Sequence, residues 1–96
     1  MKESQFQSKL VKRLKLIFPG CIVLKNDARL MQGIPDLSVF YKDKWAMLEC
    51  KASANEHHQP GQDAYIDILN SMSIAFFIYP ENEEEVINEL RKYFGV

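Results

Sequence analysis

The chain has 96 residues with 12 basic and 13 acidic side chains, a formal net charge of −1, and 47% hydrophobic residues. This length fits one domain (residues 1–96), and this apolar fraction is typical of globular rather than disordered proteins. No apolar run approaches the ~20 residues of a membrane span, and the first residues lack a signal-peptide pattern. Because Cys21 and Cys50 are too few for a disulfide framework, we expect a cytoplasmic protein with free thiols and no membrane partner.

The periodicity of apolar residues predicts three helices and four strands. In chain order these are a helix over 4–18, strands over 21–24, 36–41 and 45–51, a helix over 61–72, a strand over 74–79 and a helix from about 81. Ser4 and Gln7 have the spacing of a capping box at the first helix, and Pro19-Gly20 ends it. The second helix repeats Tyr65, Ile68, Leu69 and Met72 along one side.

This order of elements predicts an α/β protein. The strand–helix–strand segment over 45–79 is typical of a parallel crossover, which is right-handed as a rule, whereas the two strands over 36–51 form a hairpin. The run Ile74–Tyr79 is apolar throughout, as expected for a strand covered on both faces. We therefore expect a mixed β-sheet of about four strands flanked by helices, in the order α-β-β-β-α-β-α.

The predicted hairpin carries acids at the ends of its strands. If the chain turns within the two residues Lys42-Asp43, Asp36 falls opposite Glu49, and their Cβ atoms lie about 5 Å apart. Lys51 lies on the same face as Glu49, because side chains alternate along a strand. A three-residue turn would instead separate the two acids onto opposite faces, unless a bulge restored the register.

Two close carboxylates repel each other unless a cation lies between them, and a hard divalent ion such as Mg²⁺ prefers oxygen ligands. The first register therefore predicts a metal site at Asp36 and Glu49, with Lys51 holding a phosphate or a nucleophilic water beside the metal. The alternative is a strand end held by a salt bridge, in which Lys51 only balances Glu49.

The charges are distributed unevenly along the chain. Residues 1–29 hold seven basic and two acidic side chains, a net of +5, whereas the remaining residues carry six more acids than bases. A basic segment beside an acidic cluster is typical of a metal site next to a polyanion. A solvated helix face explains the lysines of the first helix nearly as well.

The segments Gly33-Ile34-Pro35-Asp36-Leu37 and Glu49-Cys50-Lys51 resemble the motifs of the PD-(D/E)XK nuclease superfamily and, more narrowly, of the virus-type replication–repair nuclease (VRR-NUC) family. Gln62 lies where that family carries a glutamine in the following helix. Glu3 and Gln7 are similar to its first-helix acid and glutamine. The resemblance covers nearly the whole chain and implies a restriction-endonuclease-like core.

The resemblance implies a metal-dependent phosphodiesterase acting on DNA. Asp36, Glu49 and the backbone carbonyl of Cys50 would bind Mg²⁺, for which Mn²⁺ would substitute, and Glu3 would complete or orient the metal shell. Lys51 would position or activate the attacking water, and Gln62 would hydrogen-bond near Lys51 or a phosphate. Contacts to the DNA backbone are expected from four basic residues: Lys9, Lys12, Lys25 and Arg29.

Small stand-alone members of the family are typically phage or bacterial homodimers that cut branched DNA such as four-way (Holliday) junctions. The resemblance therefore implies a homodimeric, structure-specific endonuclease. Two alternatives stay open at this point. One is a sequence-specific nicking or homing endonuclease, and the other is a catalytically silent DNA-binding module on the same fold.

Overall fold

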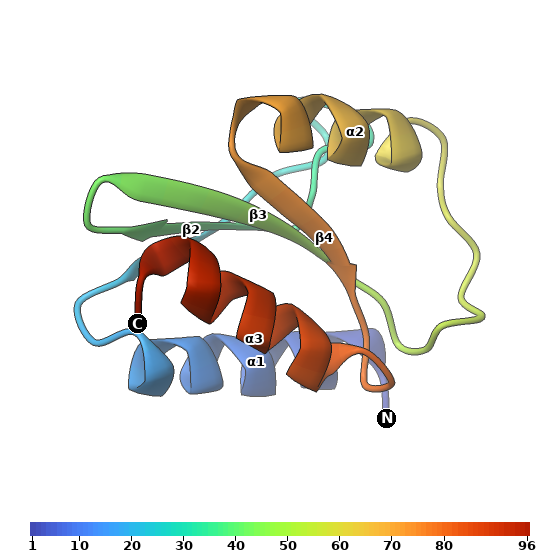
Figure 1. The fold of residues 1–96 in the computed structure, drawn as a ribbon. Coiled ribbons are helices and arrows are strands. Elements are labelled where there is room, and N and C mark those ends of the chain that lie inside the picture. Colours follow the sequence, from blue (N-terminus) through green and yellow to red (C-terminus); the bar gives the residue numbers. More distant parts are fainter.

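The computed structural model describes residues 1–96, which form three helices and one four-stranded sheet (Figure 1). The elements are α1 (Glu3–Ile17), β1 (Ile22–Lys25), β2 (Leu37–Tyr41), β3 (Lys44–Cys50), α2 (Gln62–Met72), β4 (Ile74–Ile78) and α3 (Glu83–Phe94). The predicted α/β class and the order α-β-β-β-α-β-α are confirmed. None of the three helices has the length and apolar character needed to cross a membrane.

The strands lie in the order β1-β2-β3-β4. Both β1–β2 and β2–β3 are antiparallel, whereas β3 and β4 are parallel, so the predicted mixed sheet and the parallel crossover through α2 are also confirmed. Helices α1 and α3 cover one face of the sheet and α2 covers the other (Figure 1). The carboxyl end of β3 therefore lies between two layers, and both can supply side chains to it.

The larger core lies between the sheet and the pair α1–α3. Fourteen buried residues form it: Phe6, Leu10, Leu14, Phe18, Leu37, Val39, Ala46, Leu48, Cys50, Ile78, Val86, Ile87, Leu90 and Phe94. On the α2 face only Ile66, Leu69 and Ala75 form a buried cluster, with half-buried side chains around them. The residues of β4 alternate between the two clusters, which explains its continuous apolar sequence.

Helix α1 begins one residue earlier than predicted, at Glu3 rather than Ser4. The backbone N–H of Lys2 donates to Oε1 of Gln5 at 3.0 Å, so Gln5 rather than the Ser4–Gln7 pair stabilises the first turn. The helix ends before Pro19, and Gly20 has a φ of +90°. This earlier start matters because it includes Glu3 in the helix.

The buried stripe of α2 differs from the predicted one. Gln62, Ile66 and Leu69 face the sheet, whereas Ile68 and Met72 are 48% and 67% exposed. Positions 62, 66 and 69 share one helical face. The apolar pattern alone suggested a stripe rotated toward Ile68, and the difference arises because the polar Gln62 occupies a buried position at the first turn.

Candidate metal centre

The hairpin of β2 and β3 has the register that aligns the two acids. Tyr41 pairs with Lys44 and Leu37 with Leu48 across the two-residue loop Lys42-Asp43. Asp36 immediately precedes β2, so its side chain lies beside Glu49 near the end of β3. The predicted two-residue turn is confirmed, and the alternative three-residue turn is wrong.

Three carboxylates converge at this end of the sheet. Glu3, Asp36 and Glu49 each place an oxygen within 4.8 Å of the others. They come from three different elements or segments: the first residue of α1, the residue before β2, and the penultimate residue of β3. The structure thus brings together the three side chains predicted to bind the metal.

Asp36 is held from two sides. Its Oδ2 accepts a hydrogen bond from the backbone N–H of Cys50 at 3.0 Å, and its backbone carbonyl accepts one from the N–H of Asn26 at 2.7 Å. The amide of Asn26 also donates to the carbonyl of Pro35 and to Oγ of Ser38, both at 2.9 Å. Asn26 was not predicted as a site residue, because a lone asparagine in a polar loop carries no periodic signal.

The three acids disfavour one another's charged forms. Burial and the nearby charge of Asp36 raise the pKa of Glu49 to about 8, and Lys51 only partly opposes this. Burial and the adjoining carboxylate of Glu56 raise the pKa of Glu3 to about 7. Burial also raises the pKa of Asp36. The cluster therefore lacks enough positive charge of its own to hold three carboxylates ionised.

One oxygen of the cluster has no hydrogen-bond partner. The side chain of Glu49 is buried, and its Oε1 is the only buried side-chain nitrogen or oxygen atom without a partner. Leaving a buried carboxylate oxygen unpaired costs free energy that native proteins normally avoid. Three convergent carboxylates, one of which has an unpaired oxygen, fit the oxygen ligand set of a divalent cation such as Mg²⁺.

Cys50 contributes in a different way from its neighbours. Its side chain is fully buried in the core on the α1–α3 side, and burial raises the pKa of its thiol. Its backbone N–H binds Asp36, as described above. Its backbone carbonyl stays the predicted fourth ligand, since it immediately follows Glu49 in the strand.

Lys51 is the basic group of the site and is only 2% exposed. Its Nζ donates to Oε1 of Gln62 at 2.7 Å and to the backbone carbonyl of His57 at 3.1 Å. The carboxylates of Glu49 and Glu56 lie 3.9 and 3.7 Å from the same nitrogen, which is beyond hydrogen-bonding distance. An ammonium group has three N–H donors, so one donor of Lys51 stays available beside the acids.

Gln62 lies near Lys51, as predicted, and links it to Glu49. Its Nε2 donates to Oε2 of Glu49 at 3.0 Å, while its Oε1 accepts from Lys51 and from the backbone N–H of Gln59. The amide orientation is fixed by these contacts, because a carboxylate accepts hydrogen bonds and an ammonium donates them. Gln62 thereby fixes the relative positions of Glu49 and Lys51.

Glu56 is a fourth acid of the site that the sequence analysis did not single out. Its Oε1 accepts from the backbone N–H of Ala52 at 2.7 Å, and the adjoining carboxyl of Glu3 lowers the pKa of Glu56. Glu56 lies in the loop between β3 and α2, where no strand or helix period relates it to the other acids. Only the folded path of this loop brings it to Lys51.

Two glycines hold the loops of the site together. A Cβ atom added to Gly33 would lie 2.7 Å from the carbonyl carbon of Gly61, and both residues have a positive φ near +90°. This close approach joins the loop before Asp36 to the residue before Gln62. Position 33 has to be glycine, because any side chain there would collide with the backbone of Gly61.

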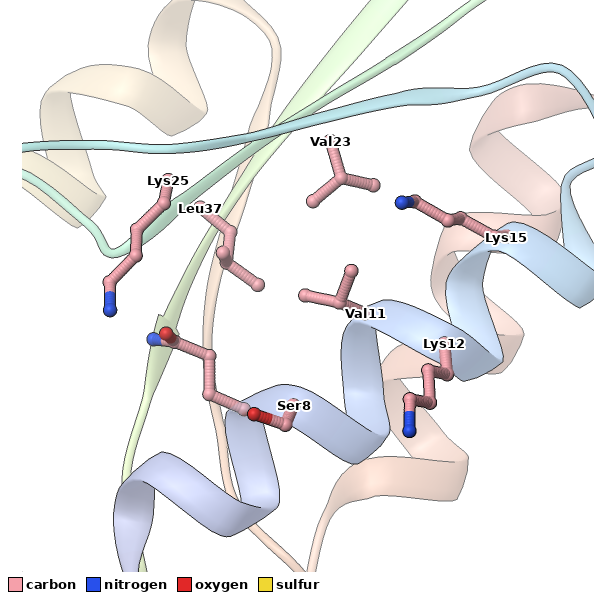
Figure 2. Close-up of a pocket in the computed structure, with 8 residues that line it drawn as sticks. Ser8, Val11, Lys12, Lys15, Val23, Lys25 and Leu37 are labelled. Carbon is pink, nitrogen blue, oxygen red and sulfur yellow. The ribbon is translucent and has the colours of Figure 1, made fainter.

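The predicted DNA-binding residues fall into two groups. Lys12 and Lys25 line a groove between α1 and the β1–β2 edge of the sheet, together with Lys15, which was not among the predicted contacts (Figure 2). Lys9 is exposed on α1 outside this groove, and Arg29 is paired with Asp27 in the loop after β1. The structure therefore brings only two of the four predicted residues together.

No family model, curated protein or solved structure matches this chain. Its function therefore has to be argued from the site itself.

Proposed function

We propose that this protein is a metal-dependent endodeoxyribonuclease of the PD-(D/E)XK type that hydrolyses phosphodiester bonds in branched DNA. The observation that carries the proposal is the convergence of Glu3, Asp36 and Glu49, with Glu49 Oε1 unpaired and the anchored ammonium of Lys51 beside it. A solely structural salt bridge would not need three acids for one lysine. It would also not leave a buried carboxylate oxygen without a partner.

Glu3, Asp36 and Glu49 would hold the Mg²⁺ ion, with the backbone carbonyl of Cys50 as a further ligand, and Mn²⁺ would substitute. When bound, such an ion polarises a phosphoryl oxygen, lowers the pKa of bound water and offsets negative charge in the transition state. Because the pKa values of Glu49 and Glu3 are raised, these carboxyls would give up protons on binding a cation, and the repulsion between them would be relieved.

Lys51 would act on the substrate through its remaining N–H donor. Two of its donors are occupied by Gln62 and His57, which fixes the direction of the third. A hydrogen bond from this ammonium to a phosphate oxygen or to the attacking water would stabilise the negative charge that develops on phosphorus oxygens. Gln62 is a positioning residue in this scheme, since it orients both Lys51 and Glu49.

The test is cleavage of a labelled four-way junction and of a linear duplex of the same sequence, in Mg²⁺, in Mn²⁺ and in chelator. We expect metal-dependent cuts near the branch point. Equal cleavage of both DNAs would support the nuclease proposal but reject a preference for branched DNA. Cutting at one fixed sequence would favour a nicking or homing endonuclease, and binding without any cleavage would favour a silent DNA-binding module.

Isosteric variants connect the activity to the site. Glu49→Gln and Asp36→Asn remove one charge each, while Asp36→Asn keeps an oxygen that accepts from Cys50 N–H. We expect each to lower the cleavage rate by about 100-fold or more, because transition-state charge stabilisation is worth several kcal/mol. Asp43→Asn, in the exposed hairpin loop, is the matched control and should cleave like the wild type.

Metal binding has a readout that is independent of cleavage. A ligand that binds only the folded state raises its melting temperature, so Mg²⁺ or Mn²⁺ should stabilise the wild type. The same ions should have little effect on Asp36→Asn or Glu49→Gln. Equal stabilisation of the wild type and both variants would place the bound metal elsewhere and contradict the proposed centre.

We further propose that the protein is a homodimer. Ile22, Leu24 and Phe40 are 59%, 51% and 39% exposed, on the face of β1–β2 opposite Val23, which packs into the larger core. Large apolar side chains exposed together are typical of interaction sites. Gel filtration with light scattering should show twice the monomer mass, and Leu24→Gln should weaken the dimer. A monomer with and without junction DNA would contradict this proposal.

A further inference from the structure

A second candidate site lies next to the metal centre, in the groove between α1 and the β1–β2 edge of the sheet (Figure 2). The groove has a volume of about 440 Å³. Apolar side chains from three elements meet at its centre, namely Val11 of α1, Val23 of β1 and Leu37 of β2. Three lysines surround them: Lys12 and Lys15 extend from α1 and Lys25 from the end of β1.

The positive charge of this groove is not balanced within the protein. None of Lys12, Lys15 and Lys25 forms an ion pair, and no acidic side chain lines the groove. Two arginines of the same basic segment differ from them, since Arg13 binds Glu83 and Glu84 and Arg29 binds Asp27. The three lysines are therefore free to bind an external anion.

The groove leads directly to the metal centre. Lys25 pairs with Leu37, the residue after Asp36, and the next residue, Asn26, binds the backbone of Asp36. On the opposite side, Gln7 lines the groove one helical turn after Glu3. A polyanion lying in the groove would thus extend from the lysines to the carboxylates. The carboxylates would repel it unless a bound cation neutralised their charge.

We propose that this groove binds the backbone of the DNA strand that flanks the cleaved bond, with phosphates on Lys12, Lys15 and Lys25 and sugars against the apolar centre. The proposal rests on the proposed nuclease function, because it assigns the groove to the same substrate. Lys25 lies on one side of the groove and Lys12 and Lys15 on the other, so the three do not converge on one point (Figure 2). This spacing suits a polymer with several phosphates better than a single small anion. The main contacts are to backbone, so binding should be largely independent of sequence.

The experiment measures DNA binding in chelator, where no cleavage occurs. Fluorescence anisotropy would compare the wild type with Lys12→Gln, Lys15→Gln, Lys25→Gln and the triple variant, on a single strand, a linear duplex and a four-way junction. Lys42→Gln is the matched control, because Lys42 is an exposed lysine of the β2–β3 hairpin loop, outside the groove and not among the predicted DNA contacts. Thermal unfolding would verify that every variant folds.

The salt dependence gives the expected result. Each lost phosphate contact reduces the slope of log K against log salt concentration by about 0.9 for duplex DNA or about 0.7 for a single strand. The slope should therefore fall by about 2 to 3 in the triple variant, by about one third of that in each single variant, and by almost nothing in Lys42→Gln. The slope change would also distinguish a single-stranded arm from a duplex arm as the occupant.

Three outcomes would overturn the groove assignment: no DNA binding by the wild type, wild-type affinity in the triple variant, or an equal loss of affinity in Lys42→Gln. The two proposals fail separately. If the wild type cleaves DNA but the groove variants bind DNA as tightly as the wild type, only the groove proposal is rejected. If DNA binding depends on the three lysines but the wild type does not cleave DNA in Mg²⁺ or Mn²⁺, only the nuclease proposal is rejected.

Discussion

The two faces of the sheet are packed in different ways. On the α1–α3 face, fourteen buried residues form a continuous core, whereas the α2 face buries a cluster of only three. Polar side chains are buried where β3 meets the start of α2, since Glu49, Lys51 and Gln62 are all at most 9% exposed. The α1–α3 face therefore supplies most of the stability, whereas the α2 face buries fewer apolar side chains and holds the polar groups of the site in position.

Truncating the larger core should have the greatest effect on stability. Leu10 of α1 is 1% exposed, and Leu10→Ala should lower the free energy of unfolding by about 2–5 kcal/mol. Leu16→Ala on the same helix is the control, because Leu16 is 81% exposed and its removal should change stability by less than about 0.5 kcal/mol. Urea denaturation measures both values. Equal losses would show that the α1–α3 face is not the main source of stability.

Gly33→Ala tests the link between the two loops of the site. Gly20→Ala carries the same backbone strain of about 1–2 kcal/mol without a nearby atom, so it is the matched control. We expect Gly33→Ala to lose more stability than Gly20→Ala, because its Cβ would collide with the backbone of Gly61. Only Gly33→Ala should also lose the thermal stabilisation by Mg²⁺, and identical behaviour of the two variants would contradict the proposed link.

Gln62→Met tests the polar contacts on the α2 face. The substitution keeps the length of the side chain but removes three hydrogen bonds: the one donated to Glu49 and those accepted from Lys51 and from the backbone N–H of Gln59. It should cost about 1–3 kcal/mol, the penalty for buried groups left unpaired, and should lower cleavage more than DNA binding. Gln59→Met is the control, because the side chain of Gln59 is exposed. A variant with wild-type stability and cleavage would show that Gln62 has no positioning role.

The stability of the metal-free protein should depend on pH, and metal should reverse this dependence. The folded metal-free protein has raised pKa values of about 8 at Glu49 and about 7 at Glu3, against 4.5 for an ordinary glutamate. Folding therefore favours their protonated forms, and the stability that they contribute is complete below about pH 4.5 and is lost as the pH rises toward about 8. In chelator, the melting temperature should therefore fall between pH 5 and 8.

Magnesium should change the sign of this trend. Because the cation binds the ionised carboxylates, its stabilising effect should increase over the same pH range. Glu49→Gln should flatten the fall in chelator and abolish most of the increase with Mg²⁺. A wild-type melting curve that is independent of pH between 5 and 8 would contradict the raised pKa values.

Much of this fold follows from local sequence patterns. The alternation along β2 and β3, the apolar run of β4 and the spacing of Phe6, Leu10 and Leu14 each indicate the correct element. The sequence offered two hairpin registers, one for a two-residue and one for a three-residue turn, and the structure has the two-residue turn that aligns Asp36 with Glu49. Asp36, Glu49 and Lys51 were predictable because they lie at the ends of the two hairpin strands, whereas Glu3 was expected only from the family resemblance.

Other features depend on contacts between segments far apart in the chain. The apolar pattern of α2 gave a rotated stripe, because the burial of Gln62 depends on Glu49 and Lys51 in another element. Glu56 and Asn26 lie in loops, where no period relates a residue to the site. The distinction between Lys15 in the groove and Lys9 outside it depends on where α1 packs on the sheet.

The sequence by itself determined the elements, their order and the acid–acid–lysine set, because these depend on short-range periodicity. Only the tertiary structure decided which side chains complete the site. Docking of α1 brings Glu3 to Asp36 and Glu49, and the contact of Gly33 with Gly61 brings the start of α2 to Lys51. Those positions result from packing across the sheet, which no local pattern encodes.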